Sequence, residues 1–213
     1  MTNLFEWISK KDTGTKIVAA LGVVAVLTAL ITIPYAVITR EGDEGLMILN
    51  GKELRWDKKD LPVGCFHDST EVTSLHLGYY NAAREEINKR VGMTLLRPCV
   101  PWMLLSIPVH IKGAVTLRVN QPVDKEHFGG TTRHNYDKRT GRILSVSVRI
   151  SPGAPPHLLE YIWLHEMGHV VGLTHDRTED SIMYPYVKEG TKLSNKDAKV
   201  LQSAYKEPHG NTK

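Results

Sequence analysis

The sequence predicts an α+β domain that follows one transmembrane helix. Residues 17–39 form a run of 23 positions without a charged side chain, which is long enough to cross a bilayer as a helix. From residue 54 onward, apolar strand-like segments alternate with segments of helical periodicity. Residues 165–175 read HEMGHVVGLTH. This string contains three closely spaced histidines and a glycine of the kind that ends a helix.

The N-terminal part of the chain is predicted to be a membrane anchor that contacts lipid through residues 17–39. Residues 1–16 contain three lysines, whereas Arg40 is the one close basic residue after the run. This bias favours a cytoplasmic N-terminus and an extracytoplasmic domain, periplasmic or extracellular. We prefer a retained anchor to a cleaved signal peptide because no convincing cleavage site follows the run. Residues 40–53 are polar and contain three glycines, and we interpret them as a juxtamembrane linker.

Charge and cysteine content narrow the class of protein further. The 213-residue chain has a formal net charge of +4, and residues 1–40 carry four basic and two acidic side chains, which leaves +2 for the remainder. Such a mild balance argues against a nucleic-acid partner. Cys65 and Cys99 would suit one disulfide in an exported domain, or would be two buried thiols in a reducing cytosol. The sequence leaves the oligomeric state open.

The folded domain is predicted over residues 54–206. Residues 54–67 lead into a first strand, and a helix over residues 70–91 follows, with Asp68 or Ser69 as its cap. One apolar stripe runs along this helix. Its members are Val72, Leu75, Tyr79, Ala83, Ile87 and Val91.

The next strands are predicted at residues 94–100 and 114–120. A right-handed crossover through the helix would make the first two strands parallel. Cys65 and Cys99 would then lie on neighbouring strands, close enough to form a disulfide.

A hairpin and two helices complete the predicted domain. Residues 128–137 and 142–150 form the two limbs of the hairpin, joined by a turn that ends at a glycine. A helix over residues 157–172 carries the histidines. The final helix begins after Ser194, which we expect to cap it together with Asp197 three residues later. It runs to about residue 205, and residues 207–213 form a tail.

Three imidazoles and one carboxylate occur at spacings that a zinc ion and a water molecule can use. His165 and His169 are four residues apart and therefore project from one face of a helix. Glu166 can reach a metal-bound water without binding the metal. Gly172 is the residue type that ends a helix in a left-handed conformation, so the chain can turn back and present His175 as a third ligand. The fourth tetrahedral position is left for water, as in catalytic zinc sites.

This pattern, together with the string SIMYP at residues 181–185, resembles the metzincin zinc metallopeptidases. The spacing from His175 to Met183 and the Met-Tyr-Pro sequence are matrixin-like, whereas Asp176 directly after the third histidine is more like the adamalysins. We expect Asp176 to accept backbone hydrogen bonds beneath the site. The resemblance implies a metzincin catalytic domain with a mixed, mostly parallel five-stranded sheet, an active-site helix and a C-terminal helix.

The resemblance also implies the activity, that of a membrane-anchored zinc endopeptidase. One catalytic Zn²⁺ would be held by His165, His169 and His175, and a zinc-activated water would attack the peptide bond with Glu166 as general base. Met183 would form a hydrophobic floor beneath the zinc. Peptides or proteins are the expected substrates. A calcium ion is conceivable, but no set of residues supports one.

The substrate cleft is also expected from the resemblance. The first limb of the hairpin would be the edge strand beside the cleft, where an extended peptide adds as a further strand. Gly129 and Gly130 would either let the substrate approach closely or form a bulge, and both interpretations stay open. Tyr184, Pro185, Tyr186 and Val187 are expected to line a side-chain pocket, although Tyr186 lies one position earlier than the matrixin pattern Pro-x-Tyr.

Two hypotheses from other classes compete with an enzyme. A catalytically silent zinc-binding module would bind a peptide or protein without needing Glu166, and a zinc-stabilised structural domain would need a fourth protein ligand near the motif. Matrixin zymogens cap the zinc with the cysteine of a Pro-Arg-Cys-Gly motif, the cysteine switch. Residues 97–101 are superficially similar to this motif, but they fall inside the domain, so we expect no cysteine switch. His127, His134 and Asp137 are interpreted as solvated loop residues rather than as a second metal site.

Overall fold

The computed structural model describes most of the predicted domain, as residues 45–66, 72–99, 113–120 and 129–206. These residues belong to one compact unit, Gly42–Lys213. Within the described ranges, no helix combines the length and the apolar character that crossing a bilayer requires. The apolar run at 17–39 and the tail at 207–213 lie outside those ranges.

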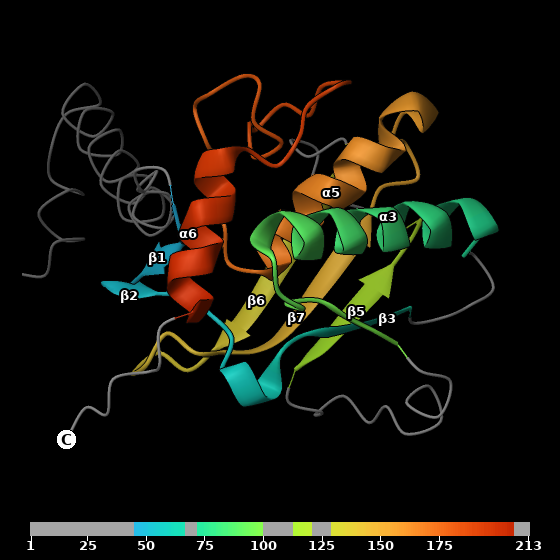
Figure 1. Cartoon of the computed structure of the whole chain (residues 1–213). Helices are drawn as coiled ribbons and strands as arrows, with labels where there is room; N and C mark the ends of the chain where they lie inside the picture. The colour runs from blue at the N-terminus through green and yellow to red at the C-terminus, as the bar shows by residue number, and fades with distance from the viewer. Residues whose placement is uncertain (1–44, 67–71, 100–112, 121–128, 207–213) are drawn as a thin grey trace, which may run out of the picture. The chain divides into compact units, whose positions relative to one another are not determined.

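A five-stranded mixed sheet forms one layer of the domain (Figure 1). The strand order is β4-β3-β5-β7-β6, in which β3 pairs in parallel with β4 and β5, and β5 pairs in parallel with β7. Strand β6 runs antiparallel to β7 and forms the edge of the sheet among the described strands. The predicted mixed, mostly parallel sheet is therefore confirmed. The strands are β3 (Val63–Phe66), β4 (Arg97–Pro98), β5 (Ala114–Arg118), β6 (Gly130–Tyr136) and β7 (Ile143–Ile150).

The inner face of the sheet follows from alternation over residues 115–118 of β5 and 145–150 of β7. Val115 and Leu117 on β5 are buried and lie in register with Val146 and Val148 on β7, which are also buried. The residues between them are polar and only partly buried. Because successive side chains of a strand point to opposite faces, this pattern gives the sheet one apolar face for the helices to cover.

The crossover from β3 to β4 is parallel, and the disulfide between Cys65 and Cys99 is present with a Cα–Cα distance of 5.2 Å. Strand β4 is shorter than expected. The side chain of Asn88 accepts hydrogen bonds from the backbone N–H groups of Leu95 and Leu96, at 2.8 and 2.9 Å. These backbone groups are therefore not available to a strand partner, and pairing is confined to two residues.

Helix α3 (Ser74–Val91) begins four residues later than predicted. Thr73 is its cap, and the Thr73 hydroxyl accepts a hydrogen bond from the backbone of His76. The caps proposed from the sequence, Asp68 and Ser69, lie outside the described residues. The helix ends at Gly92, whose φ of 70° is in the left-handed region that glycine adopts without strain.

The buried face of α3 is rotated from the predicted stripe. Tyr80 is buried instead of Tyr79, and its hydroxyl donates a hydrogen bond to the carbonyl of Gly64 on β3. Leu75 is 48% exposed, so its assignment to the buried stripe was wrong. The buried side chains of the helix are Tyr80, Ala83, Ile87 and Val91.

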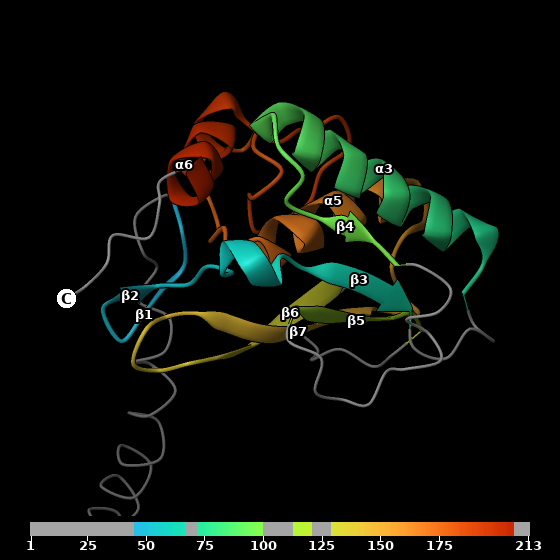
Figure 2. The same cartoon turned by 60° about the horizontal axis from the view of Figure 1, so that its bottom comes forward.

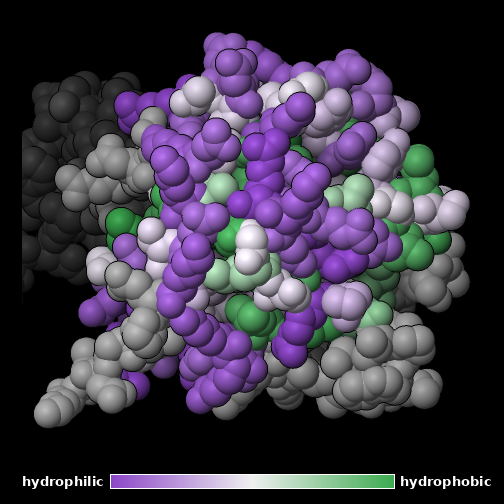
Figure 3. All heavy atoms as spheres, in the orientation of Figure 1, coloured by the Kyte–Doolittle hydropathy of each residue, from purple (hydrophilic) through white to green (hydrophobic). Residues whose placement is uncertain are grey.

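In the orientation of Figure 1, the described residues present a largely hydrophilic surface (Figure 3).

Helix α5 (Leu159–Val170) is buried on nearly all sides, and its buried residues include His165 and Glu166. A short 3-10 turn, η2 (Pro156–Leu158), precedes it. Helices α3 and α5 lie over the same face of the sheet (Figure 2). The backbone of α5 ends in a Schellman motif, with hydrogen bonds from Leu173 N to Gly168 O (3.1 Å) and from Gly172 N to His169 O (2.9 Å). The φ of Gly172 is 97°.

Buried donors from distant parts of the chain satisfy the last carbonyls of α5. The Trp56 indole donates to Val170 O at 2.7 Å, and the Tyr205 hydroxyl donates to Val171 O at 3.0 Å. Tyr205 belongs to α6 (Asn195–Lys206), which begins with the predicted capping box. In this box, Asp197 N donates to Ser194 Oγ at 3.0 Å, and Ser194 N donates to the Asp197 carboxylate at 3.3 Å. The end of α5 is therefore fixed by elements on both sides of it in the sequence.

The stretch at 45–53, expected as a linker, is folded against the domain. Strands β1 (Ile48–Leu49) and β2 (Lys52–Glu53) form a hairpin whose two turn residues both have positive φ. Leu46 is buried in the core and bridges Leu173. Asn-Gly at 50–51 is a strong hairpin pattern, but the glycine-rich polar surroundings favoured a linker.

Candidate active site

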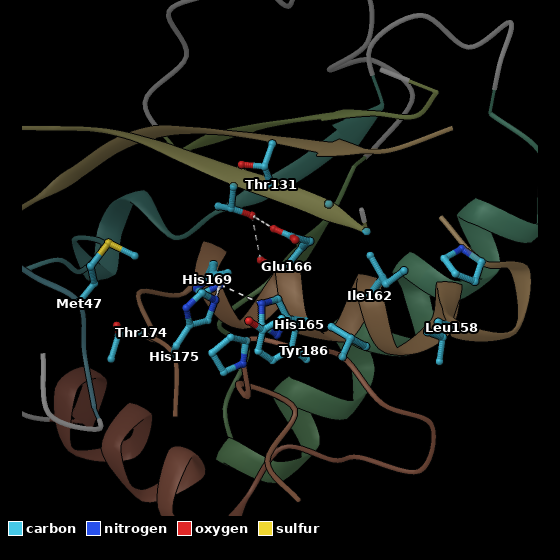
Figure 4. A pocket seen from close by; sticks show the side chains of 16 residues that line it. Met47, Thr131, Leu158, Ile162, His165, Glu166, His169, Thr174, His175 and Tyr186 are labelled. Atoms are coloured by element: carbon cyan, nitrogen blue, oxygen red, sulfur yellow. Dashed lines mark hydrogen bonds between the residues drawn. The ribbon is translucent and has the colours of Figure 1, made fainter. Parts of the chain in front are cut away.

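The three histidine side chains converge at the end of α5 (Figure 4). The Nε2 atom of His169 lies 3.1 Å from Nε2 of His165 and 3.2 Å from Nε2 of His175. Tetrahedral zinc with Zn–N bonds of about 2.0–2.1 Å separates its nitrogen ligands by about 3.3 Å. The spacing of the imidazoles therefore fits a zinc site, and all three ligand atoms lie within 4.8 Å of one another.

Backbone carbonyls orient the two helical imidazoles. The Nδ1–H of His165 donates to Ile182 O at 2.6 Å, and the Nδ1–H of His169 donates to Leu173 O at 2.8 Å. These hydrogen bonds leave the Nε2 lone pairs directed at the common point. Burial lowers the pKa of His165 to about 4, and burial together with the neighbouring imidazoles lowers the pKa of His169. Both rings are therefore neutral near pH 7, as metal ligands must be.

Glu166 points from α5 towards strand β6 (Figure 4). Its carboxylate is buried, and the hydroxyl of Thr132 donates a hydrogen bond of 2.5 Å to Oε2. Burial raises the pKa of Glu166 to about 7, and the hydrogen bond from Thr132 opposes this rise. A carboxyl whose pKa lies near the working pH is suited to taking up and releasing a proton. Thr132 belongs to no sequence motif, so its hydrogen bond to Glu166 is known only from the structure.

Two glycines allow β6 to pass close to α5. A Cβ atom on Gly130 would lie 2.7 Å from Glu166 Oε1, and one on Gly129 would lie 3.2 Å from Ile162 Cδ1. The ladder is regular at Gly130, which pairs with Ile150, while the irregularity of the β6–β7 pair lies further along the strand at 135–136. The ladder therefore has no bulge at Gly130, and both glycines let β6 pack closely on α5; their contact with a substrate stays a prediction.

The methionine turn is held beneath the histidines by hydrogen bonds. Asp176 N donates to Met183 O at 2.8 Å, and the Asp176 carboxylate accepts from Thr178 N at 2.8 Å. Met183 N donates to Ser181 Oγ at 3.0 Å, and Ser181 Oγ donates to the Asp197 carboxylate at 3.1 Å. Met183 itself is fully buried. Asp197 thus connects the turn to α6, which the sequence did not indicate beyond its capping role.

Gly168, inside α5, contacts the methionine turn. A Cβ atom at this position would collide with Sδ of Met183, whereas a Cβ on Gly78 in α3 would meet nothing within 4 Å. A glycine inside a helix costs about 1 kcal/mol relative to alanine, so its presence in the middle of α5 indicates a packing constraint. The sequence offered this clue, because Gly168 stands between His165 and His169.

We expect opposite effects when these two helical glycines are replaced. Gly78→Ala should stabilise the protein by about 0.5–1 kcal/mol through helix propensity, while Gly168→Ala should destabilise it by about 1–3 kcal/mol through overpacking against Met183. Urea unfolding of both variants measures the two free energies. A stabilising effect of Gly168→Ala would show that Met183 yields without cost and would contradict the packing argument.

The histidines and Glu166 border a cleft of about 680 Å³ between β6 and α5. Of the residues expected to line a substrate pocket, Gly129, Gly130, Pro185, Tyr186 and Val187 do line this cleft. Tyr184 is not among the lining residues, and its ring instead packs against that of Tyr186, at 5.9 Å between centroids. The lining residues that the sequence did not indicate are Met47, Thr131, Thr132, Pro155, Leu158, Ile162 and Thr174.

The interpretation of His134 as a solvated loop residue was wrong. His134 lies on β6, and its Nε2–H donates to His169 O at 2.8 Å. Burial lowers its pKa. Asp137 follows the strand and accepts a hydrogen bond from the backbone of Arg139 in the turn. His127 lies outside the described residues.

The sheet topology and the three-histidine cluster define a metzincin-like domain. Residues 121–206 match the matrixin family model. Metalloendoproteinase 2-MMP of Arabidopsis thaliana is 42% identical over 98 residues, which cover 45% of this chain and 24% of that protein. Metalloendoproteinase 5-MMP of the same plant is 36% identical over 63 residues, or 28% of this chain and 18% of that protein. The chain is therefore matrixin-like, and its match spans at most about a quarter of these relatives.

Among solved structures, one similar chain is high choriolytic enzyme 1, a hatching enzyme zinc-protease from the medaka fish Oryzias latipes. The TM-score is 0.46 at 13% sequence identity, and the alignment covers 76% of this chain and 100% of that one.

Proposed function

We propose that the protein is a zinc-dependent endopeptidase. The observation that carries this proposal is the placement of Glu166 in the same cleft as three convergent imidazoles. The match to matrixin over residues 121–206 and the two metalloendoproteinase relatives support it. A silent binding module or a structural zinc domain would not need a buried carboxylate whose pKa is raised towards 7.

We assign the steps of the proposed hydrolysis to residues that the structure describes. His165, His169 and His175 would hold one zinc ion, which when bound supplies a Lewis acid that polarises the scissile carbonyl and lowers the pKa of water. Glu166 accepts the proton of the attacking water and passes it to the leaving amine. Thr132 holds the Glu166 carboxylate on the cleft side of α5. Met183 is fully buried in the turn whose Ile182 carbonyl accepts the hydrogen bond of His165, and we assign it the apolar floor beneath the zinc.

The edge strand provides a physical basis for binding an extended peptide. Strand β6 pairs only with β7 among the described strands, and its residues 130–132 line the cleft. Backbone groups on the outer side of β6 can therefore pair with a substrate as a further strand. Such pairing depends on the backbone rather than on chain ends, which favours cleavage inside a polypeptide.

Cleavage products from an unfolded protein test this proposal. The full chain, loaded with zinc, is incubated with a reduced and alkylated protein, and the new termini are identified by mass spectrometry. Internal cuts that disappear with a chelator and return with added zinc are expected. Removal of single residues from the ends, or no cutting by the zinc-loaded chain, would contradict an endopeptidase.

We further propose that residues 17–39 anchor the domain in a membrane, with the N-terminus in the cytoplasm and the domain outside the cytosol. The uncharged run of 23 residues supports this, as does the disulfide between Cys65 and Cys99, since such bonds persist in oxidising compartments. The double substitution Val24→Lys and Leu27→Lys should release the protein from membranes during carbonate extraction. A control with Lys58→Ala and Lys59→Ala, on the exposed 3-10 turn η1 (Lys58–Asp60), should stay in the membrane fraction. Retention of the double-lysine variant would contradict the anchor.

A further inference from the structure

Met47 brings a side chain from the N-terminal segment to the cleft. It lines the cleft together with Thr174 and His175. In Figure 4, Met47 and Thr174 lie on one side of the imidazoles, whereas Ile162 and Leu158 lie on the other side. The cleft therefore continues past the histidines at both ends, and Met47 borders one of them.

The backbone around Met47 is fixed on both sides. Met47 N donates to Gly172 O at 2.7 Å, and Met47 O accepts from Leu54 N at 2.8 Å. Thr174 N donates to Gly45 O at 3.0 Å, which extends the pairing to the loop that leads to His175. Met47 is therefore held at a fixed place beside the third histidine.

The side chains next to Met47 have different environments. Leu46 is buried in the core, while Ile48 is 53% exposed and is not among the residues that line the cleft. Met47 is half-buried between them. A half-buried, flexible thioether at the wall of a cleft offers an adaptable apolar contact to a ligand.

The direction of β6 assigns the two ends of the cleft to the two sides of a bound peptide. Strand β6 begins at Gly130, near Glu166, and reaches His134, which bonds to His169 O near the end of α5. Antiparallel pairing is the more stable arrangement of strands. A peptide antiparallel to β6 would run from the Met47 end to the Ile162 end, with its amino-terminal part beside Met47.

We propose that Met47 is a specificity-determining residue that contacts a substrate side chain on the amino-terminal side of the scissile bond and favours a large apolar one. This inference rests on the proposed endopeptidase function. At most about a third of Met47 is still exposed, and burial of that part by a ligand contributes roughly a threefold difference in affinity. The effect falls on KM, since Met47 is remote from the proton-transferring Glu166.

Cleavage profiles of a peptide mixture test this assignment. The full chain is compared with its Met47→Ala, Met47→Glu and Ile48→Ala variants. Met47→Ala should raise KM about threefold for peptides with a large apolar residue on the amino-terminal side, with kcat little changed. Met47→Glu should shift the preference at that position to lysine or arginine. Ile48→Ala should leave the profile unchanged, and preferences on the carboxyl-terminal side should be the same in all four proteins.

A binding measurement gives a readout that needs no cleavage. Fluorescence anisotropy of labelled peptides, with a large apolar or a small residue at this position, is measured on Glu166→Gln and on the double variant Glu166→Gln, Met47→Ala. Only the apolar peptide should bind more weakly to the double variant, by about threefold. Unchanged profiles and unchanged binding would overturn the role of Met47. If the wild-type chain cleaves no peptide at all, the proposed function fails, and the binding arm alone still decides whether Met47 contacts the peptide.

Discussion

Replacing His169 by alanine is expected to abolish zinc binding and, with it, all peptide cleavage. His169 is the central ligand of the cluster, with its Nε2 atom within 3.2 Å of both other Nε2 atoms. A ligand present at about a thousand times its Kd stabilises the folded state by roughly 4 kcal/mol, which raises Tm by about 10 °C in a domain of this size. The variant should lose this zinc-dependent rise completely.

The comparison of zinc-loaded with metal-free protein makes this measurement specific. Loss of the hydrogen bond between His169 and Leu173 O will also lower the stability of the metal-free variant, but that change is present with and without zinc. His157→Ala is the matched control, because His157 is exposed on the turn that precedes the same helix. Differential scanning calorimetry of the three proteins should give a zinc-dependent shift in wild type and His157→Ala alone. A full shift in His169→Ala would exclude it as a ligand.

Replacing Glu166 by glutamine is expected to lower kcat by about 10²–10⁴-fold without loss of zinc. Glutamine keeps the shape of the side chain and its contact with Thr132, but it cannot accept the proton of the attacking water. KM should change little, because Glu166 is not expected to hold the peptide. Steady-state kinetics on one peptide substrate, with the zinc content measured in the same samples, separates these effects.

The control for Glu166→Gln lies on the same helix. Glu160 is exposed in the first turn of α5, and Glu160→Gln should retain wild-type kcat and KM. If Glu166→Gln keeps more than about a tenth of the wild-type kcat, another group must act as the base. A large loss of zinc in Glu166→Gln would instead indicate that this carboxylate helps to hold the metal.

The site was predictable where the sequence is local. His165 and His169 share one helix face, and Gly172 ends that helix, so three positions within eight residues determine most of the geometry. The strands were likewise visible, because residues 115–118 of β5 and 145–150 of β7 alternate between buried apolar and partly buried polar residues. The positions of these helices and strands follow from short-range periodicity, which can be read without knowing which segments pack against each other.

Features that depend on contacts between distant segments could not be predicted. Thr132 meets Glu166 only because β6 passes over α5, and Met47 reaches the cleft only through pairing with Gly172. The rotation of α3 is of the same kind. Tyr79 and Tyr80 fit helical spacing almost equally well, and the choice of Tyr80 follows from its hydrogen bond to Gly64 on β3.

A zinc titration with simultaneous measurement of peptide cleavage tests the central claim most directly. Metal-free full-length protein receives increasing zinc, and bound metal and cleavage rate are recorded in the same samples. We predict that the rate rises in proportion to bound zinc and reaches its maximum at one zinc per chain. Saturation with one zinc and no cleavage, or full cleavage by the metal-free chain, would contradict a zinc-dependent endopeptidase.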